Sequence, residues 1–498
     1  MSIIKKLSEM RDFGGSRKTA GLPEKVIHQF ASKDNALIEA VNDAYLAFTE
    51  LKRSLPELLV QDEADQIVSL QTGIVNFYAE DVLNPYVALA ARGPWVITSK
   101  GAVIHDTGGY GMLSFGHAPA KVLKAMANRQ VMANVMTASF SQLRLIRALK
   151  KEVGRSFGCC PFEGFLFLNS GSEAVSAGAR ISDINAKQAT DTGGSHAGNK
   201  IRQVALMGGF HGRTDRPARY SDSSRPIYKK YLASFRDQDD LRTVAPNNLK
   251  HLQQVFDDAK AEGVFIESMF LEPVMGEGNP GQAISREFYD LARKLTFQHG
   301  SLLLVDSIQA GLRAHGCLSI VDYPGFEGIE APDMETYSKA LNAGQYPLSV
   351  LAMNQRTASL YRKGVYGNTM TTNPRALDVA YQVLSQLTLE LKQNIREKGQ
   401  EFLFKLKQAE IELGGLITSV QGTGLLLSCE LHPDLKSYGK DSIEEYLRKH
   451  GIGVIHGGKN SLRFTPHFNV TSDEIDLVVT SLKHALISCS KLLRAKAA

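Results

Sequence analysis

Short apolar runs and amphipathic stretches alternate through the middle of the chain. The runs at 165–168, 202–207, 264–271 and 301–305 are bounded by glycine or polar residues, which is typical of buried strands. Between the last two runs, residues 285–298 carry apolar positions at helical spacing. Because strands and helices alternate in this way, the sequence predicts an α/β fold with a large, doubly wound and mostly parallel sheet.

The two ends of the chain have a different pattern. Within residues 1–75, apolar side chains recur at helical spacing, so we expect a helical N-terminal extension. These side chains are Ile38, Val41, Ala44, Tyr45 and Phe48. Residues 95–106 read as short strands and turns, which indicate a hairpin. We expect a smaller α+β domain of residues 76–125 and 386–498 beside a large domain of residues 126–385.

The stretch from 301 to 344 contains the most informative pair of residues. Asp306 follows an apolar run directly, and open α/β sheets bind ligands at the carboxyl ends of their strands. Lys339 lies among small residues, where a lysine can lose its proton near neutral pH and attack a carbonyl. Such a pair can hold pyridoxal phosphate, with the acid on the ring nitrogen and the amine in a Schiff base. An isolated pair of this kind is more often a helix cap and a surface lysine.

Two further segments suggest binding sites for a phosphate group and for a planar ring. Ser170 and Glu173 form a Ser-x-x-Glu capping box directly after the run at 165–168. A strand, a glycine turn and a capped helix direct free N–H groups and the positive end of the helix dipole at one spot, which suits a phosphate. Capping boxes also begin many ordinary helices, however. Phe210 stands among glycines after the next run, so its ring can lie on a planar cofactor or anchor the loop in the core.

Composition narrows the class of protein. The chain has 498 residues, 43% of them hydrophobic and 22% charged, with a net charge of +5, so we expect no nucleic-acid or membrane partner. The five cysteines form neither a disulfide framework nor a metal-binding pattern. No run approaches the ~20 apolar residues of a transmembrane helix, and residues 1–17 lack the apolar core of a signal peptide. We therefore expect a cytoplasmic protein without a bound metal.

Six segments occur in the order and approximate spacing of the class III pyridoxal-phosphate aminotransferases. They are residues 169–174, 210–214, 272–278, 305–309, 338–341 and 367–369. Residues 115–117 and 462–464 extend the match, so the resemblance covers roughly residues 76 to 485. The chain resembles the ornithine and ω-amino acid aminotransferases of this family. That implies the fold of the type I pyridoxal-phosphate transferases, with a large and a small domain.

The resemblance also implies how the cofactor, pyridoxal 5'-phosphate, is held. Lys339 would form the Schiff base and carry the proton during catalysis, while Asp306 would keep the ring nitrogen protonated. Phe210 would stack on the ring and Gln309 would bond its phenolic oxygen. The phosphate contacts are implied for Gly171, Ser172 and Thr369. In this family the threonine reaches the phosphate of the neighbouring subunit, so a homodimer is expected.

Three other positions match residues that face the substrate in the family. Arg463 matches the arginine that grips an α-carboxylate, or it is a surface charge of the small domain. Glu277 matches the acid that pairs with this arginine when the substrate has no α-carboxylate. Tyr110 matches a substrate-facing tyrosine of ornithine-type enzymes. These residues imply an aminotransferase that works by two half-reactions between a diamino or ω-amino acid and a 2-oxo acid such as 2-oxoglutarate.

Some positions depart from the family pattern. Ser307 replaces a usual glutamate and Ala310 a usual threonine, and Thr371 and Thr372 stand where glycines are usual. These departures affect the expected substrate pocket rather than the cofactor residues. Two alternatives therefore stay open: a class III racemase or aminomutase with the same cofactor residues, and a relative that binds the cofactor without catalysis.

Overall fold

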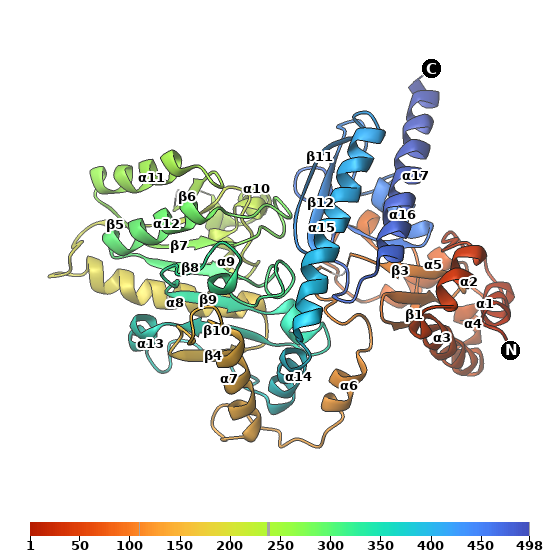
Figure 1. The fold of residues 1–498 in the computed structure, drawn as a ribbon, viewed down its shortest axis with the longest axis horizontal. Coiled ribbons are helices and arrows are strands. Elements are labelled where there is room, and N and C mark those ends of the chain that lie inside the picture. The colour runs from red at the N-terminus through yellow and green to blue at the C-terminus, as the bar shows by residue number, and fades with distance from the viewer. Residues whose placement is uncertain (109, 237–239, 498) are drawn as a thin grey trace. The chain divides into compact units, whose positions relative to one another are not determined.

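The computed structural model describes residues 1–108, 110–236 and 240–497. The chain forms two compact units (Figure 1). Unit 1 comprises residues 1–120, 397–421 and 427–498, and unit 2 comprises residues 121–396 and 422–426. The domain boundaries that we expect at residues 75, 125 and 385 stay a prediction.

A seven-stranded sheet forms the centre of unit 2 within the described residues. In spatial order its strands are β4 (Gly164–Leu168), β10 (Ser349–Met353), β9 (Met334–Tyr337), β8 (Leu302–Asp306), β7 (Val264–Leu271), β5 (Lys200–Leu206) and β6 (Leu241–Val244). Strand β10 is antiparallel to both of its neighbours, β4 and β9, and every other pair is parallel. The prediction of a mostly parallel sheet is therefore confirmed.

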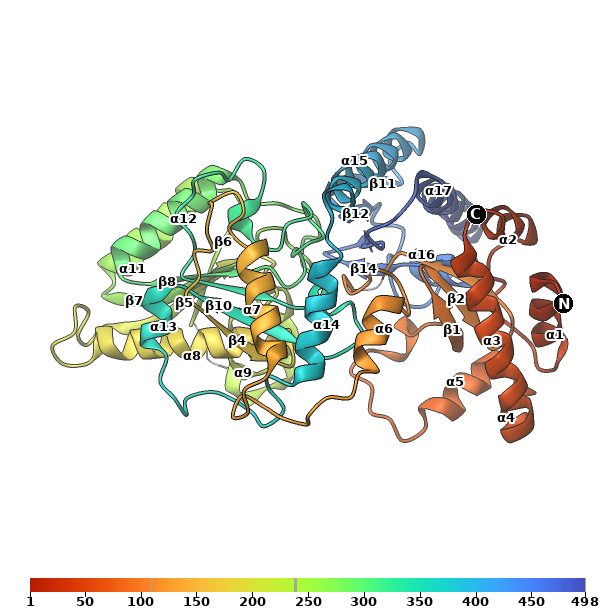
Figure 2. The same ribbon diagram turned by 60° about the horizontal axis from the view of Figure 1, so that its bottom comes forward.

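Helices cover both faces of this sheet. Helix α8 (Gly171–Thr190) connects β4 to β5 in one direction along the sheet, whereas α11 (Leu249–Ala261) and α12 (Arg286–His299) lead from β6 through β7 to β8 in the other. Because such crossovers are right-handed, the two directions place α8 on one face and α11 and α12 on the opposite face (Figure 2). This is the doubly wound arrangement that the sequence predicts.

Other helices surround the large sheet. They are α6 (Ala120–Met126), α7 (Phe140–Glu152), α9 (Asp215–Tyr220), α10 (Arg225–Tyr231), α13 (Gln355–Leu360) and α14 (Pro374–Ser385). Helix α8 lies very close to the sheet at Gly178, where an added Cβ would be only 2.5 Å from a methyl group of Leu304. The small side chain therefore sets the spacing between α8 and strand β8, which is completely buried.

One edge of the sheet, called the functional edge below, collects residues from several of the sequence motifs. Strand β4 runs in the same direction as β5, β7, β8 and β9, because it and β9 are both antiparallel to β10. The segments that follow these five strands therefore begin at the same edge. They contain Gly171, Phe210, Glu272, Asp306 and Lys339. The topology thus brings together motifs that are far apart in the sequence.

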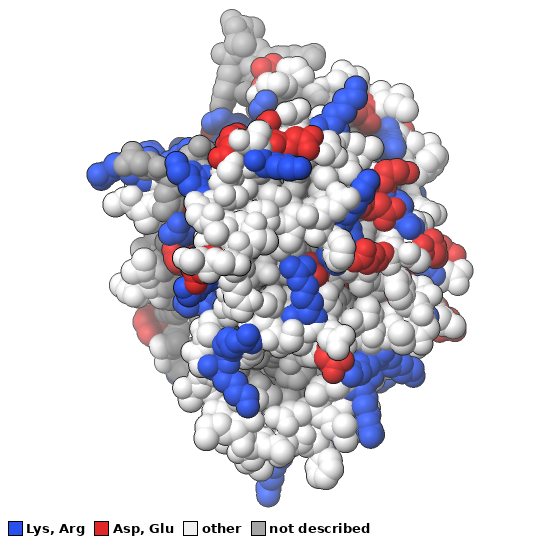
Figure 3. All heavy atoms as spheres, turned by 90° about the vertical axis from the view of Figure 1, so that its left-hand side faces the viewer, with Lys and Arg blue, Asp and Glu red and all other residues white. Residues whose placement is uncertain are grey.

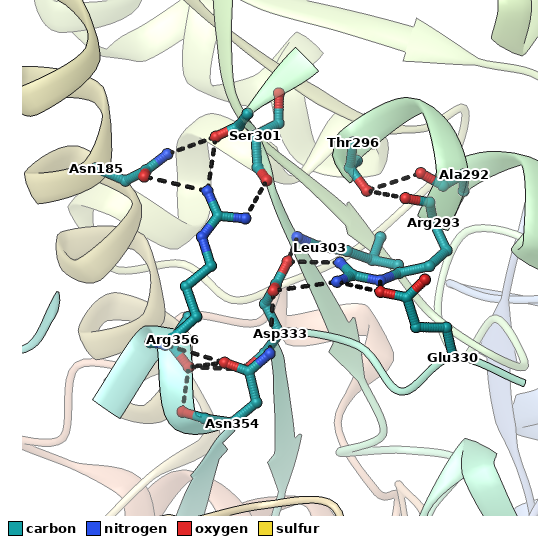
Figure 4. Close-up of polar contacts among 12 residues, drawn as sticks. Asn185, Ala292, Arg293, Thr296, Ser301, Leu303, Glu330, Asp333, Asn354 and Arg356 are labelled. Carbon is teal, nitrogen blue, oxygen red and sulfur yellow. Dashed lines mark hydrogen bonds and ion pairs between the residues drawn. The ribbon is translucent and has the colours of Figure 1, made fainter. Parts of the chain in front are cut away.

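A buried polar network holds the opposite edge of the sheet (Figure 4). Asp333 accepts hydrogen bonds from Arg293 Nη1 at 2.8 Å, from the backbone N–H of Leu303 at 2.9 Å and from Asn354 Nδ2 at 3.1 Å. Arg356 donates to the carbonyl of Gly300 at 3.0 Å. These contacts link the starts of β8 and β9 to α12 and α13. A buried carboxylate is stabilised when several donors bond it, so these contacts hold the starts of β8 and β9 in place.

Two four-stranded sheets lie mainly in unit 1 of the described chain. The first contains β1 (Ala88–Arg92), β2 (Trp95–Thr98), β3 (Val103–Asp106) and β13 (Ile452–Gly453), and the second contains β11 (Ile417–Thr423), β12 (Leu426–Leu431), β15 (Ser461–Phe464) and β14 (Ile455–Gly457). Strands β2 and β3 form the predicted hairpin. The associated helices are α15 (Leu389–Glu412), α16 (Ile443–Lys449) and α17 (Ser472–Ala497).

The N-terminal residues form an integral part of unit 1. They fold into α1 (Ile3–Asp12), α2 (Glu24–Ala31), α3 (Asn35–Ser54), α4 (Pro56–Leu59) and α5 (Glu63–Gln71). The buried ammonium of Lys100, in the β2–β3 turn, donates to the carbonyls of Gly14 at 2.5 Å, Leu59 at 2.8 Å and Gln61 at 2.6 Å. The indole N–H of Trp95 donates to Asp34 at 2.5 Å. These buried bonds attach the N-terminal helices to the small sheet.

The surface carries charges of both signs. On the face shown in Figure 3, Lys and Arg side chains are interspersed with Asp and Glu side chains. Among the helices in the described ranges, none is long and apolar enough to span a membrane.

Candidate active site

A cavity of about 200 Å³ lies at the functional edge of the unit 2 sheet. Seven of the ten predicted site residues line it: Gly171, Ser172, Phe210, Glu277, Asp306, Gln309 and Lys339. The cofactor residues that the sequence indicates, apart from Thr369, therefore meet in one place.

Asp306 ends strand β8 and is buried in the cavity wall. Its Oδ1 accepts hydrogen bonds from Thr336 Oγ1 at 3.0 Å and from the N–H of Ile308 at 3.2 Å. Its Oδ2 lies 2.8 Å from Nδ1 of His211. Contacts from three directions fix the orientation of this carboxylate, which suits a residue that must meet a ring nitrogen.

Lys339 begins the short 3₁₀ helix η5 (Lys339–Asn342), which follows β9. Its φ angle is 46°, in the left-handed region that is costly for a residue with a side chain. The half-buried ammonium donates to Oε1 of Gln309. The amide nitrogen of Gln309 is buried and has no hydrogen-bond partner among the described residues. Gln309 therefore keeps a donor for a molecule in the cavity.

The start of helix α8 lines one part of the cavity. Ser170 caps the helix and forms both bonds of the predicted capping box with Glu173. The first N–H groups of a helix have no partner within it, and here they belong to Gly171 and Ser172. A Cβ at Gly212 would lie 2.3 Å from Ser172 Oγ, so the loop after β5 can approach the helix only with glycine at this position.

A contact that the sequence does not predict supports this helix start. Nδ2 of Asn368 donates to Glu173 Oε1 at 2.6 Å, and Oδ1 of Asn368 accepts from Asn169 Nδ2 at 3.1 Å. The adjacent Thr369 is exposed, and its carbonyl accepts from Asn134 Nδ2 at 3.2 Å. Thr369 is not among the residues that line the cavity of its own chain. Its contact with a phosphate stays a prediction.

Glu277 lines the cavity and lies near an unpredicted cation, Arg213. Arg213 Nη2 lies 4.0 Å from Glu277 Oε1, and its guanidinium carbon lies 5.2 Å from the ring centre of Phe210. The arginine belongs to the Phe-His-Gly-Arg-Thr segment that the sequence analysis singles out. The sequence analysis assigns a role only to Phe210 of that segment.

The two remaining predicted residues belong to unit 1. Arg463 is buried in β15, which pairs with β12 and β14. Tyr110 has a φ angle of 51° and a ring centre 6.0 Å from that of Tyr78, and burial raises the pKa of its hydroxyl above the usual range. The substrate roles of Arg463 and Tyr110 stay predictions.

Two further cavity residues, Glu272 and His211, have no role in the sequence analysis. Glu272 follows β7 and accepts from the N–H groups of Phe210 at 3.0 Å and Gly276 at 2.8 Å. Burial raises the pKa of its carboxyl to about 7, the negative charge of Asp306 acts in the same direction, and His211 opposes the shift. Both residues lie in segments quoted for the resemblance, but only the fold shows that the segments meet.

The donor set fits pyridoxal phosphate. The cavity combines a fixed carboxylate for a ring nitrogen, an amine for a carbonyl, an amide donor without a partner, and a helix start for a phosphate. Phe210 lines the same cavity. These groups match the reactive atoms of the cofactor.

Comparisons with known proteins agree with this fit. The family model described as "Aminotransferase class-III" matches residues 77–486. The succinylornithine transaminase of Salmonella heidelberg is 29% identical over 411 residues, which cover 82% of this chain and 93% of that protein. The ornithine aminotransferase structure from Toxoplasma gondii has a TM-score of 0.73 at 21% identity, over 89% of this chain and 99% of that one. The N-acetylornithine aminotransferase structure from Stenotrophomonas maltophilia has a TM-score of 0.64 at 23% identity, over 84% and 98%.

Proposed function

This chain belongs to the class-III aminotransferases, and from that premise we propose that it transfers an amino group between a diamino or ω-amino acid and a 2-oxo acid such as 2-oxoglutarate. The enzyme is a pyridoxal-phosphate-dependent aminotransferase. The substrate proposal is supported by the names of its relatives, which are transaminases of succinylornithine, ornithine and N-acetylornithine. It is carried above all by the acid–arginine pair Glu277 and Arg213 beside the cofactor cavity.

The cavity geometry supports the cofactor roles that we propose. Pyridoxal phosphate, when bound, supplies an electron sink for a negative charge on the substrate. Asp306 would hold a proton on the ring nitrogen, and its contacts with Thr336 and His211 keep its oxygens in place. Gln309 would donate to the ring oxygen through its amide nitrogen, and Phe210, which lines the cavity, would stack on the ring.

Lys339 binds the cofactor and moves a proton. Its half-buried amine lines the cavity and could accept a proton from one carbon atom of the bound substrate and return it to another. Gln309 Oε1 keeps the amine oriented when it is not bonded to the cofactor. The N–H groups of Gly171 and Ser172 at the start of α8 would hold the phosphate.

Arg463 binds the α-carboxylate of the amino acid or oxo acid, and Tyr110 faces the substrate. Glu277 balances the charge of an arginine when the substrate presents only its terminal amine. Arg213, which lies against both Phe210 and Glu277, offers a second cation for the far carboxylate of a dicarboxylic substrate such as 2-oxoglutarate.

The active form is a homodimer in the cytoplasm. Apolar side chains of residues 131–140 are exposed in the single chain, at 66% to 89%, and a patch of this kind normally faces a partner. They are Val131, Met132, Val135, Met136 and Phe140. Asn134, within this segment, donates to the carbonyl of Thr369, which supports an interface that includes the threonine expected to reach the partner's phosphate. The five cysteines are free, which suits a reducing compartment.

A donor screen tests the substrate proposal. Full-length enzyme with pyridoxal phosphate is incubated with 2-oxoglutarate and a panel of α-amino, ω-amino and diamino acids, and glutamate is measured. Ornithine-like donors should give the highest kcat/KM. A racemase or aminomutase would instead convert an amino acid without any oxo acid, and a non-catalytic relative would convert none of the panel.

Sedimentation tests the homodimer. We expect a dimer for the wild type, and Met136→Asp should shift it toward monomer and weaken cofactor binding about tenfold or more, because a charge is costly in an apolar interface. A fully active monomer would contradict the proposal.

A further inference from the structure

The loop that contains Tyr110 is fixed by local contacts within unit 1. Tyr110 has a φ angle of 51°, in the left-handed region that is costly for a residue with a side chain. A residue keeps such a conformation only where the surrounding contacts fix the backbone. The contacts of the neighbouring residues therefore decide where this tyrosine lies.

One set of contacts joins the loop to the segment that follows strand β15. Thr465 stands two residues after Arg463 and is completely buried. Its Oγ1 accepts a hydrogen bond from the N–H of Gly111 at 3.2 Å, and its own N–H donates to the carbonyl of Thr107 at 2.7 Å. Thr465 thus binds the loop on both sides of Tyr110.

The same two segments meet again at Phe468. Its N–H donates to the carbonyl of Ser114 at 2.7 Å, and its ring centre lies 5.9 Å from that of Phe115. The loop and residues 465–468 are therefore joined by backbone bonds, a side-chain bond and an aromatic contact. A shift of the loop would break contacts with the segment that continues from the strand of Arg463.

A carboxylate binds the two ends of the loop. Oδ1 of Asp106 accepts from the N–H of Gly108 at 2.9 Å, before Tyr110, and Oδ2 lies 3.0 Å from Nε2 of His117, after it. The main chain of His117 also exchanges two hydrogen bonds with that of Gly93, at 2.7 and 3.1 Å. Because one side chain contacts both ends, an opened loop would lose these bonds.

We propose that Thr465 and the Asp106–His117 pair act as positioning residues for Tyr110. They hold it beside the strand of Arg463, so that both side chains bind one substrate together. The inference deepens the proposed function and rests on the substrate roles given there to Tyr110 and Arg463. Loss of a positioning contact should raise KM and leave kcat nearly unchanged, because the bound substrate is held less well while the reacting groups stay in place.

The experiment is steady-state kinetics of the full-length holoenzyme with L-ornithine and 2-oxoglutarate. Thr465→Val keeps the shape of the side chain but leaves the buried N–H of Gly111 without its acceptor. KM for L-ornithine should therefore rise about tenfold, with kcat within about threefold of the wild type. Thr465→Ser restores a hydroxyl and should recover most of the lost affinity.

Two histidine variants test the other positioning contact. His117→Leu removes the bond to Asp106 and should raise KM for L-ornithine about fivefold. His117→Gln carries an amide that can donate to the same carboxylate, so it should recover part of this loss. Normal KM values for His117→Leu would overturn the role of the Asp106–His117 pair.

A double-variant cycle separates positioning from general damage. If Thr465 acts through Tyr110, Thr465→Val should raise KM about tenfold in the wild type but less than about twofold in Tyr110→Phe, which already lacks the hydroxyl. Thr98→Val is the matched control, because Thr98 is also completely buried in unit 1 and its Oγ1 accepts from the N–H of Ala102 at 3.0 Å. It should lower the melting temperature about as much as Thr465→Val and leave KM unchanged in both backgrounds.

The outcomes separate the inference from the proposed function. If the wild type forms no glutamate from any donor of the screen, the proposed function fails and the inference fails with it. If it uses other donors but not L-ornithine, or if Tyr110→Phe has a normal KM, the inference is wrong while amino transfer stands. An equal rise of KM for Thr465→Val in both backgrounds would likewise overturn the role of Thr465.

Discussion

The hydroxyl of Ser307 donates a hydrogen bond of 2.5 Å to the buried carboxylate of Glu335. The same carboxylate accepts from Ser319 Oγ, from the N–H of Ile320 at 3.0 Å and from the hydroxyl of Tyr337 at 3.0 Å. Ser307 is the position at which this chain departs from the usual glutamate. The carboxylate of Glu335, on the neighbouring strand β9, thus lies beside Ser307. Ser307 directly follows Asp306 in the chain.

The titration of Glu335 should make stability depend on pH. Burial raises the pKa of this carboxyl from 4.5 to about 7, so the folded state binds its proton more tightly than the unfolded state does. Its stabilising contribution is complete below about pH 4.5 and decreases as pH rises toward 7, by about 3 kcal/mol in total. Urea unfolding at several pH values between these limits measures the effect. Glu272 titrates in the same direction.

Glu335→Gln isolates the contribution of this one residue. The free energy of unfolding of the variant should fall less steeply between about pH 5 and pH 7 than that of the wild type. The variant should also be less stable near pH 5, because an amide nitrogen faces the hydrogen-bond donors around it. Parallel pH curves for the two proteins would show that Glu335 does not titrate in this range.

Removal of the Schiff-base lysine should separate folding from chemistry. Lys339→Ala should keep the melting temperature of the apoenzyme within a few degrees, because the side chain is only half buried. It should lose the visible absorbance of the bound cofactor and at least about a thousandfold of the turnover rate, since the base and the covalent bond are both lost. Lys294→Ala, at an exposed position of α12, is the control. Near-normal activity of Lys339→Ala would show that another lysine binds the cofactor.

Much of the cofactor cavity could be predicted because its residues directly follow strands. A buried strand is recognisable as a short apolar run, and parallel strands bring their carboxyl ends to one edge. The position of Asp306 relative to the sheet therefore follows from local sequence, whereas strand β9, which precedes Lys339, is not among the predicted runs. The capping box of Ser170 and Glu173 is local as well, and the structure contains it.

Contacts between distant segments could not be predicted in the same way. The bond from His211 to Asp306 and the bond from Ser307 to Glu335 depend on which strands are neighbours and on their register. No periodic pattern encodes a buried polar pair of this kind. The same holds for Lys100, which reads as an ordinary surface lysine in the sequence but is 1% exposed in the structure.

Lys100 should be essential for the attachment of the N-terminal helices. Lys100→Met keeps the length of the side chain but leaves the carbonyls of Gly14, Leu59 and Gln61 without their donor. Burial also lowers the pKa of Lys100, so part of the gain from these bonds is offset by desolvation. We expect a loss of about 2–3 kcal/mol in the free energy of unfolding, measured with urea.

Limited proteolysis gives a second measurement on the same variant. Residues 14–61 should be cleaved faster in Lys100→Met, because the buried bonds that hold this segment are lost. Lys5→Met, at an exposed position of α1, should behave like the wild type. Unchanged stability and cleavage of Lys100→Met would mean that hydrophobic packing alone holds the N-terminal helices.

Asn368 should support the phosphate end of the cavity although it does not line it. Its amide bonds both Glu173 and Asn169, and Glu173 in turn accepts the backbone N–H groups of Asn169 at 2.7 Å and Ser170 at 3.1 Å. Asn368→Ala removes this support, so the first turn of α8 should hold a phosphate less firmly.

Dissociation constants for pyridoxal phosphate and for pyridoxal without phosphate, measured by equilibrium dialysis, distinguish this effect from general damage. The phosphate form should bind about tenfold more weakly and pyridoxal should be unaffected, since one charge-assisted hydrogen bond contributes about 1.5 kcal/mol. Equal weakening of both ligands would place the defect elsewhere, and Asn128→Ala, at an exposed position, should change neither.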